Sequence, residues 1–291
     1  VATAALLASG DELLGRLASG EVTAALAVEF ARMPPARVRG ATLSCGVRVG
    51  APGPDDPPGA ARLAGTVAGV ADALIADVFL VPADGVPFGL YAVDADAPGL
   101  TRAPVVSLDP TRPLADLTVD GALARPVATG EAAAHAVAAA LTAGAAMLAC
   151  EQLGVAQRCL DMTVAYLKER RQFARPVGSF QALKHRLADV WVAVSQARAA
   201  ARYAAACLAE GDADTPVAVA LAKSACGDAA VLAAQECVQL HGGIGFTWEH
   251  PAHLFLKRAK SGSLAFGAPD RHRAVLASLV GLPPPPGGPG D

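Results

Sequence analysis

The sequence predicts an α+β protein in which a β-rich segment precedes a helical bundle. Between residues 39 and 128, short apolar runs alternate with turn residues, which is typical of a small antiparallel barrel or sandwich. From Glu131 almost to the end, apolar residues recur at helical spacing with short breaks, which predicts an antiparallel bundle. Alanine is abundant and aromatic residues make up only 4%. This composition favours close helix packing, because alanine is the strongest helix former.

The β-rich segment carries turn signals but no recognisable chemistry. Residues 83–85, Ala-Asp-Gly, separate two apolar runs and predict a hairpin. The proline-rich stretch 51–60 is expected to be an exposed loop. Asp72, Asp77 and Asp84 are expected at turns and strand ends, because no nucleophile, acid pair or metal-ligand set accompanies them.

Four parts are expected along the chain. The start should contain one helix over residues 5–17 and a strand near 24–30. The second half should contain five helices, at about 131–167, 177–209, 213–241, 250–262 and 270–280. The expected parts are a remnant of an N-terminal helical domain (1–38), a central β domain (39–128), a C-terminal helical bundle (129–281) and a disordered or polyproline-like tail (282–291).

Charge and cysteine usage narrow the class of protein. The formal net charge is −3, so no nucleic-acid or membrane-surface partner is indicated. No uninterrupted apolar run reaches the roughly 18 residues that would span a bilayer. The chain starts at Val1, and the early Asp11 and Glu12 are unlike a secretory signal. The six cysteines include no CxxC pair. Buried thiols of a cytoplasmic protein are expected, with neither disulfides nor a metal site.

Residues 164–191 join two amphipathic helices through a short charged break. The break runs from Arg170 to Phe173 and continues with Arg175 and Pro176, which suits the first turn of the second helix. The apolar residues that follow at helical spacing are Val177, Phe180, Leu183, Leu187, Val190, Trp191 and Val194. Arginines beside an aromatic ring suit an anion attached to a flat ring. A solvated corner between two helices is the alternative.

Residues 237–260 contain a Gly-Gly-Ile-Gly turn. The turn follows a helix and lacks the spacing of a dinucleotide fingerprint, which makes a Rossmann site a poor interpretation. The bare backbone at Gly242 and Gly243 can approach a phosphate or a ring closely, and a helix C-cap is the alternative. The Glu-His-x-x-His cluster at 249–253 includes Pro251, so a capping role is favoured over a metal site.

Together, these two stretches resemble the acyl-CoA dehydrogenase family. ERRQFARPVGSFQALKHRLADV is similar to the family's R-x-x-F-G-x-P-x-x-x-F-Q-x-x-x-H-x-x-A-D segment, with Ala174 in place of glycine. QLHGGIGFTWEHPAHLFLKRAK is similar to its Q-x-x-G-G-x-G-[YF] segment. The resemblance covers residues 129–281 strongly and 60–128 moderately. It implies the family's central antiparallel β domain and C-terminal four-helix bundle, with most of the N-terminal helical domain missing here.

The resemblance also implies a cofactor. Members of this family bind FAD, and the C-terminal segments of one subunit close over the flavin of its neighbour. Arg170, Gln172 and Phe173 would then contact FAD, with Arg170 near the pyrophosphate. The remaining implied contacts, across the subunit interface, are Gln181, Gln239, Gly242 and Gly243. An arginine fork, an aromatic ring and bare glycine backbone agree with that role.

Two features of the family are missing from the sequence. The flavin-side motif of the central domain, an aromatic residue followed by Ile/Val-Thr-Asn or -Ser, is absent, and Ala71 and Asp72 stand where the threonine step would fall. The catalytic glutamate of many relatives is replaced by Phe266, which precedes Gly267, and a phenyl ring cannot take a proton. Some relatives carry the glutamate near Gly144 instead, and that place is also empty.

The implied reaction requires a base. A carboxylate removes the α-proton of the acyl-CoA thioester while the β-hydrogen leaves as hydride to the flavin. Glu151 lies about 10 Å along the helix from Gly144 and is a weak substitute. Its simpler interpretation is an acid on a helix surface. Asp270 is a comparably weak candidate.

The favoured hypothesis is a subunit of an FAD-dependent acyl-CoA dehydrogenase that lacks the base and completes the flavin site of another chain. The resemblance is to heteromeric actinobacterial members, such as heterotetramers, that act on bulky or steroid-side-chain acyl-CoAs. A self-sufficient enzyme with a relocated acid and a flavin-free scaffold are the alternatives. The expected partners are acyl-CoA, a homologous chain or a second copy, and an electron-transfer protein.

Overall fold

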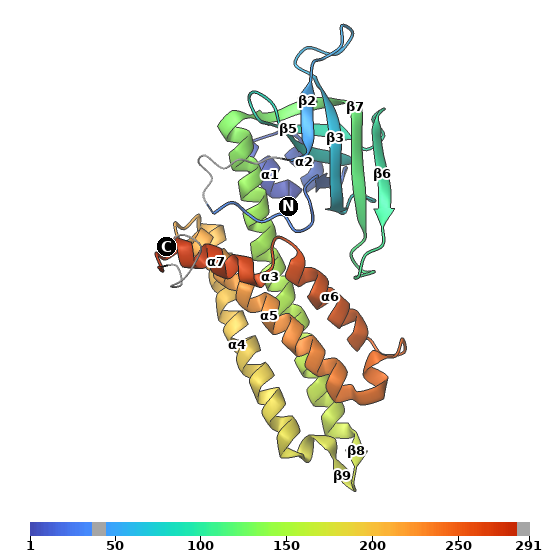
Figure 1. Ribbon diagram of the computed structural model, residues 1–291, viewed down its shortest axis with the longest axis vertical. Coiled ribbons are helices and arrows are strands. Elements are labelled where there is room, and N and C mark those ends of the chain that lie inside the picture. The colour runs from blue at the N-terminus through green and yellow to red at the C-terminus, as the bar shows by residue number, and fades with distance from the viewer. Residues whose placement is uncertain (37–44, 284–291) are drawn as a thin grey trace, which may run out of the picture. The chain divides into compact units, whose positions relative to one another are not determined.

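The computed structural model describes residues 1–36 and 45–283 (Figure 1). Two compact units make up the chain, Val1–Gly144 and Ala145–Asp291. The division falls inside helix α3 (Gly130–Glu169), which starts directly after the last strand of the first unit. The predicted tail, 282–291, lies outside the described residues except for Leu282 and Pro283.

The chain starts with two short helices, so the prediction of one helix over 5–17 was wrong. Gly10 ends the first helix in the left-handed conformation, at φ 70° and ψ 25°, which glycine adopts readily. The carboxylate of Asp11 then accepts a hydrogen bond from the backbone N–H of Leu13 at the start of the second helix. The elements are α1 (Ala2–Ser9), α2 (Leu13–Ala18) and β1 (Ala24–Leu26).

Seven strands of the first unit form one mixed sheet. Its path runs β1-β4-β5-β7-β3-β2, and β6 pairs with β7 off this path. Strand β1 is parallel to β4, and the other pairs are antiparallel. Asp84, just after β4, exchanges backbone hydrogen bonds with Val47 and Val49 of β2, and these bonds partly close the sheet. The strands after β1 are β2 (Val47–Gly50), β3 (Ala61–Ala71), β4 (Val78–Ala83), β5 (Gly89–Asp94), β6 (Leu100–Val105) and β7 (Leu114–Thr129).

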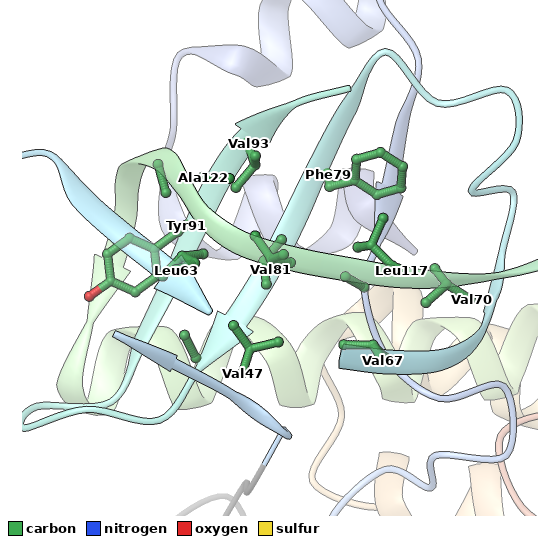
Figure 2. Close-up of a cluster of buried hydrophobic side chains, with 14 of the residues drawn as sticks. Val47, Leu63, Val67, Val70, Phe79, Val81, Tyr91, Val93, Leu117 and Ala122 are labelled. Carbon is green, nitrogen blue, oxygen red and sulfur yellow. The ribbon is translucent and has the colours of Figure 1, made fainter. Parts of the chain in front are cut away.

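One apolar cluster fills the concave side of this sheet. Figure 2 shows Phe79 and Val81 of β4 together with Leu63 of β3 and Leu117 of β7, all fully buried. Alternating burial along β3 and β7 is what a sheet with one buried face requires. The predicted hairpin joins β4 to β5 through residues 84–88, a longer loop than a tight two-residue turn.

The second unit is a bundle of long helices, as predicted. Its cores consist largely of alanine and cysteine side chains, which lets the helices approach closely. After α3, the elements are β8 (Arg171–Gln172), β9 (Arg175–Pro176), the 3-10 helix η1 (Val177–Ser179), α4 (Gln181–Glu210), α5 (Thr215–His241), the 3-10 helix η2 (Gly242–Phe246), α6 (Ala252–Leu264) and α7 (Pro269–Leu279).

The start of α4 differs from the expectation. Pro176 pairs with Arg171 in a two-stranded ribbon, and α4 begins only at Gln181, so the placement of Pro176 in its first turn was wrong. Val190 and Val194 of the predicted apolar stripe are buried, but Trp191 is 62% exposed. Consecutive residues of a helix point about 100° apart, so Trp191 cannot share the buried face with Val190.

Two helical stretches are long and apolar enough to cross a membrane by length and composition, Gly130–Glu169 and Thr215–Phe246. The run-length criterion overlooked them because isolated polar residues interrupt their apolar runs. The most apolar 18-residue window is 61% buried inside the protein in the first stretch and 67% buried in the second. Such burial is expected of helices in the core of a protein.

Candidate functional site

The residues implied to contact a cofactor lie at one end of the helical bundle. Arg170 directly follows α3, Gln172 and Phe173 belong to the β8–β9 ribbon, and Gln181 is the first residue of α4. Gln239 is in the last turn of α5, just before the Gly242–Gly243 turn that starts η2. Figure 1 shows the α5–α6 junction at the same end of the bundle as β8 and β9.

The β8–β9 ribbon is a hairpin with a two-residue loop. Phe173 and Ala174 form that loop, with φ angles of 53° and 60°. Positive φ at both positions matches the tight turn type that favours strand twist, and glycine usually supplies it. Ala174 therefore adopts a conformation that glycine takes more readily, at the position where the family segment has glycine. The loop holds the Phe173 ring outward, 87% exposed.

Cationic and aromatic side chains surround this hairpin. The guanidinium carbon of Arg175 lies 3.9 Å from the ring centroid of Phe180, and the rings of Phe173 and Phe180 meet edge to face at 6.0 Å. Arg170 is exposed, and within the described residues no carboxylate lies at ion-pair distance from it. An exposed guanidinium without a carboxylate is suited to an incoming anion.

The Gly242–Gly243 turn presents bare backbone to solvent. Gly242 has φ 63° and ψ −141°, and its N–H donates to the carbonyl of Gln239 at the end of α5. A Cβ added at Gly242 or Gly243 would meet nothing within 4 Å. The turn is therefore a helix cap that also leaves room for a ligand close to its backbone.

Phe266 lies where the family resemblance implies a catalytic carboxylate. Phe266 has φ 53° and is half-buried. Its side chain packs against the apolar cluster that α3, α4 and α5 form around Ala149, Ala197 and Cys226. This position therefore supplies packing and no proton acceptor.

Two buried side chains hold the backbone around Phe266. The ammonium of Lys223, which is fully buried, donates to the carbonyls of Gly262 and Gly267, each at 3.1 Å. The Nε2–H of His272 donates to the carbonyl of Phe266 at 2.8 Å. Burial and the charge of Lys223 lower the pKa of His272, which keeps that imidazole neutral near pH 7.

Neither candidate substitute base is placed against Phe266 by a recorded contact. The carboxylate of Glu151 accepts a hydrogen bond from Nε of Arg258 at 2.7 Å, and both side chains are half-exposed. This carboxylate therefore already has an arginine partner within the bundle. Asp270 is an exposed residue in the first turn of α7, a usual place for an acid at a helix start.

In the first unit, the place of the missing flavin-side motif is a turn. Ala71 ends β3, and Asp72 follows in the left-handed conformation with φ 62°. The carbonyl of Asp72 accepts the N–H groups of Ile75 and Ala76. Asp77 lies just before β4, where hydrogen bonds from Thr23 lower its pKa. The acids therefore lie at turns and strand ends, as expected from the sequence.

In the described parts of the chain, His250 caps a helix and most cysteines are buried thiols. His250 accepts the N–H of Ala252 at 3.3 Å, near the start of α6, as the capping interpretation requires. Among residues 1–36 and 45–283, no group of three His, Cys, Asp or Glu is arranged to hold a metal ion. The cysteines there form no disulfide, and four of them are buried in the helical bundle.

Sequence reasoning missed Lys223 and His272. The signal for Lys223 was a single cation in an alanine-rich helix whose other residues nearby are small or apolar. Such a residue must either reach solvent or find acceptors inside the protein. No comparable signal marks His272, because its acceptor is a backbone carbonyl six residues earlier in the sequence.

Residues 134–280 match the family model for the C-terminal domain of acyl-CoA dehydrogenases. The chain belongs to the acyl-CoA dehydrogenase family. Over 176 residues it is 44% identical to acyl-CoA dehydrogenase IpdE2 of Mycobacterium tuberculosis, an alignment that covers 60% of this chain and 50% of the relative.

Two solved structures have the same fold over most of this chain. A variant of the Tcur3481–Tcur3483 steroid ACAD matches with a TM-score of 0.78 and 30% identity, covering 96% of this chain and 74% of that chain. The ChsE4–ChsE5 complex from Mycobacterium tuberculosis matches with a TM-score of 0.78 and 28% identity, covering 94% and 71%. The chain spans half or less of the length of the three curated relatives IpdE2 (from two species) and FadE34, with which it aligns.

Proposed function

We propose that this chain is a subunit of an FAD-dependent acyl-CoA dehydrogenase and completes the flavin site of a homologous chain. The observation that carries the proposal is the contrast between two parts of the bundle. An exposed set of cofactor-type residues around Arg170, Phe173 and Gly242 lies at one end. Phe266 packs into the core where a carboxylate would be needed.

The residues at the bundle end fit the chemistry of FAD. A guanidinium without a carboxylate partner suits the diphosphate, and Gln181 and Gln239 are exposed amides that can donate and accept hydrogen bonds. The bare backbone at Gly242 and Gly243 allows close approach of a ring or a phosphate. When bound, FAD supplies the hydride acceptor for the desaturation.

The base is proposed to come from the partner chain. Desaturation of an acyl-CoA thioester requires a carboxylate beside the α-carbon. In this chain the family position holds Phe266, whose backbone is fixed by Lys223 and His272. A heteromer in which the other chain brings the carboxylate, and binds the flavin through its own β domain, accounts for both missing features.

A bulky acyl group is proposed as the substrate class. A steroid ACAD and the ChsE4–ChsE5 complex are structural relatives with 30% and 28% identity and broad coverage. That one relative is a steroid ACAD and the other a complex of two named chains supports a steroid-like acyl group and a two-chain assembly for this protein. An electron-transfer protein as acceptor and a cytoplasmic location belong to the same proposal.

The source of the base can be tested in the assembled pair. We expect Glu151→Gln combined with Asp270→Asn in this chain to leave acyl-CoA turnover within about twofold, since neither acid takes part. Loss of a catalytic base typically costs at least 10²-fold. A drop of about that size, with the pair still assembled, would instead favour a self-sufficient chain with a relocated acid.

The control for this experiment is Glu236→Gln, which removes an acid of α5 that pairs with Arg186 away from Phe266. It matches Glu151→Gln because both substitutions break one ion pair with arginine. If the double variant and the Glu236→Gln control have equal melting temperatures and equal turnover, an indirect effect through stability is excluded.

A further inference from the structure

Three rings from separate segments stack at the end of the bundle that carries the proposed cofactor contacts. The Tyr166 ring of α3 lies 4.4 Å from that of His241, with an interplanar angle of 25°. The ring of His250 lies 4.4 Å from the ring of His241, with an interplanar angle of 39°. His241 therefore contacts a ring of α3 and a ring of the segment before α6, and it is only 3% exposed.

A hydrogen bond fixes the orientation of the central ring. Nδ1 of His241 lies 2.7 Å from the carbonyl oxygen of Cys237, one turn earlier in α5. A carbonyl can only accept, so Nδ1 carries the proton and donates it. The imidazole is thus held by one hydrogen bond in its plane and by contacts with two rings.

The glycine turn is built directly on this ring. Gly242 follows His241 in the chain, and η2 folds back onto the last turn of α5. A Cβ at Gly245 would lie 2.4 Å from the carbonyl oxygen of Val238 and 3.0 Å from Cβ of His241. The turn therefore packs tightly against the last turn of α5, the helix turn that carries the His241 ring.

We infer that the column of Tyr166, His241 and His250 positions the Gly242–Gly243 turn for its ligand, and that His250 makes this positioning sensitive to acid. The inference rests on the proposed function for the identity of the ligand, FAD. These three are positioning residues, because they act on the ligand through the backbone of the turn.

The groups that face the column explain the acid sensitivity. Tyr166 of α3 and Cys237 of α5 lie next to His241. His253 of α6 follows His250 by three residues, and its ring packs against Trp248. Burial, His241 and His253 together lower the pKa of His250. Protonation of His250 would place a charge beside the two imidazoles of His241 and His253, which oppose it.

The sign of the effect follows from linkage. Histidine in the unfolded chain titrates near 6.5. Because the pKa of His250 is lowered in the folded state, its contribution to stability is complete above about 6.5. That contribution is lost as the pH falls through the folded pKa. His272 adds a contribution of the same sign, which is unchanged when variants at position 250 are compared.

The test compares FAD binding by the co-expressed pair of chains between pH 7.5 and 5.5. We expect the affinity of the wild type to fall about threefold or more over this range, because protonation of His250 disturbs the turn that binds the ligand. His250→Phe keeps a flat ring without a titrating group and should change less than twofold. His250→Ala should bind FAD more weakly already at pH 7.5. Equal acid sensitivity of wild type and His250→Phe would overturn the inference.

A second readout does not depend on flavin. Amide hydrogen exchange of the peptide covering residues 239–247 at pH 7.5 should be faster in His250→Ala and Tyr166→Leu than in wild type, while His250→Phe should match wild type. Unchanged exchange in both ring-removing variants would also overturn the inference. If the wild type binds no FAD at any pH, the proposed function fails, and the exchange comparison still decides whether the column positions the turn.

Discussion

Replacing Arg170 with alanine is expected to lower the FAD affinity of the assembled pair by about tenfold or more. Arg170 is exposed at the end of α3, and within the described residues no carboxylate is at ion-pair distance. A hydrogen bond to a charged group contributes about 1.5–3 kcal/mol, and 1.4 kcal/mol corresponds to tenfold in affinity. Flavin absorbance per protein after extensive dialysis measures the loss.

Arg202→Ala is the matched control for Arg170→Ala. Arg202 is an exposed arginine of α4 in the same bundle. Among the described residues, its side chain has no hydrogen bond or ion pair. It should retain the flavin content of the wild type. Arg170→Lys should recover only part of the affinity, because an ammonium lacks the fork that binds a diphosphate through two parallel hydrogen bonds. Full flavin content in Arg170→Ala would contradict the assignment of the diphosphate contact.

Replacing Lys223 with alanine is expected to destabilise the bundle by about 3 kcal/mol or more. Its ammonium is fully buried and donates to the carbonyls of Gly262 and Gly267. Buried acceptors left without a donor cost about 1–3 kcal/mol each, and the deleted side chain leaves a cavity as well. The midpoint of urea unfolding, at unchanged slope, measures the change.

Two further variants separate the charge of Lys223 from its volume. Lys223→Met fills most of the space but removes the donor, so it should recover only the part of the loss that comes from the cavity. Lys260→Met, at an exposed position of α6, should stay within about 0.5 kcal/mol of wild type. If Lys223→Met were as stable as wild type, the carbonyls around Phe266 would not depend on the ammonium.

Much of the fold follows from local sequence patterns. The long helices were predicted because their apolar residues recur at helical spacing over many turns, and the hairpin between β4 and β5 because turn residues separate two apolar runs. The break between α1 and α2 was missed because one glycine interrupts an otherwise helical pattern. Its left-handed conformation is visible only in the structure.

The candidate site was less accessible from the sequence. Periodicity alone left the segments around Arg170 and Gly242 open between a site and an ordinary helix corner, and the family resemblance favoured a site. The column of Tyr166, His241 and His250 brings together residues up to 84 positions apart. No local sequence pattern could therefore predict it. The sequence led to the interpretation that Phe266 replaces the base, which stays a prediction, and the packing of Phe266 into the bundle is seen only in the structure.

The most direct test of whether this chain only completes the flavin site of another chain is the amount of flavin per chain. It should be measured by absorbance on this protein purified alone and again after co-expression with a homologous acyl-CoA dehydrogenase chain that carries the glutamate. The proposal predicts no flavin on the chain alone and about one flavin per pair of chains in the complex. About one flavin per chain on the protein alone would contradict it, because the site would then be complete without a partner.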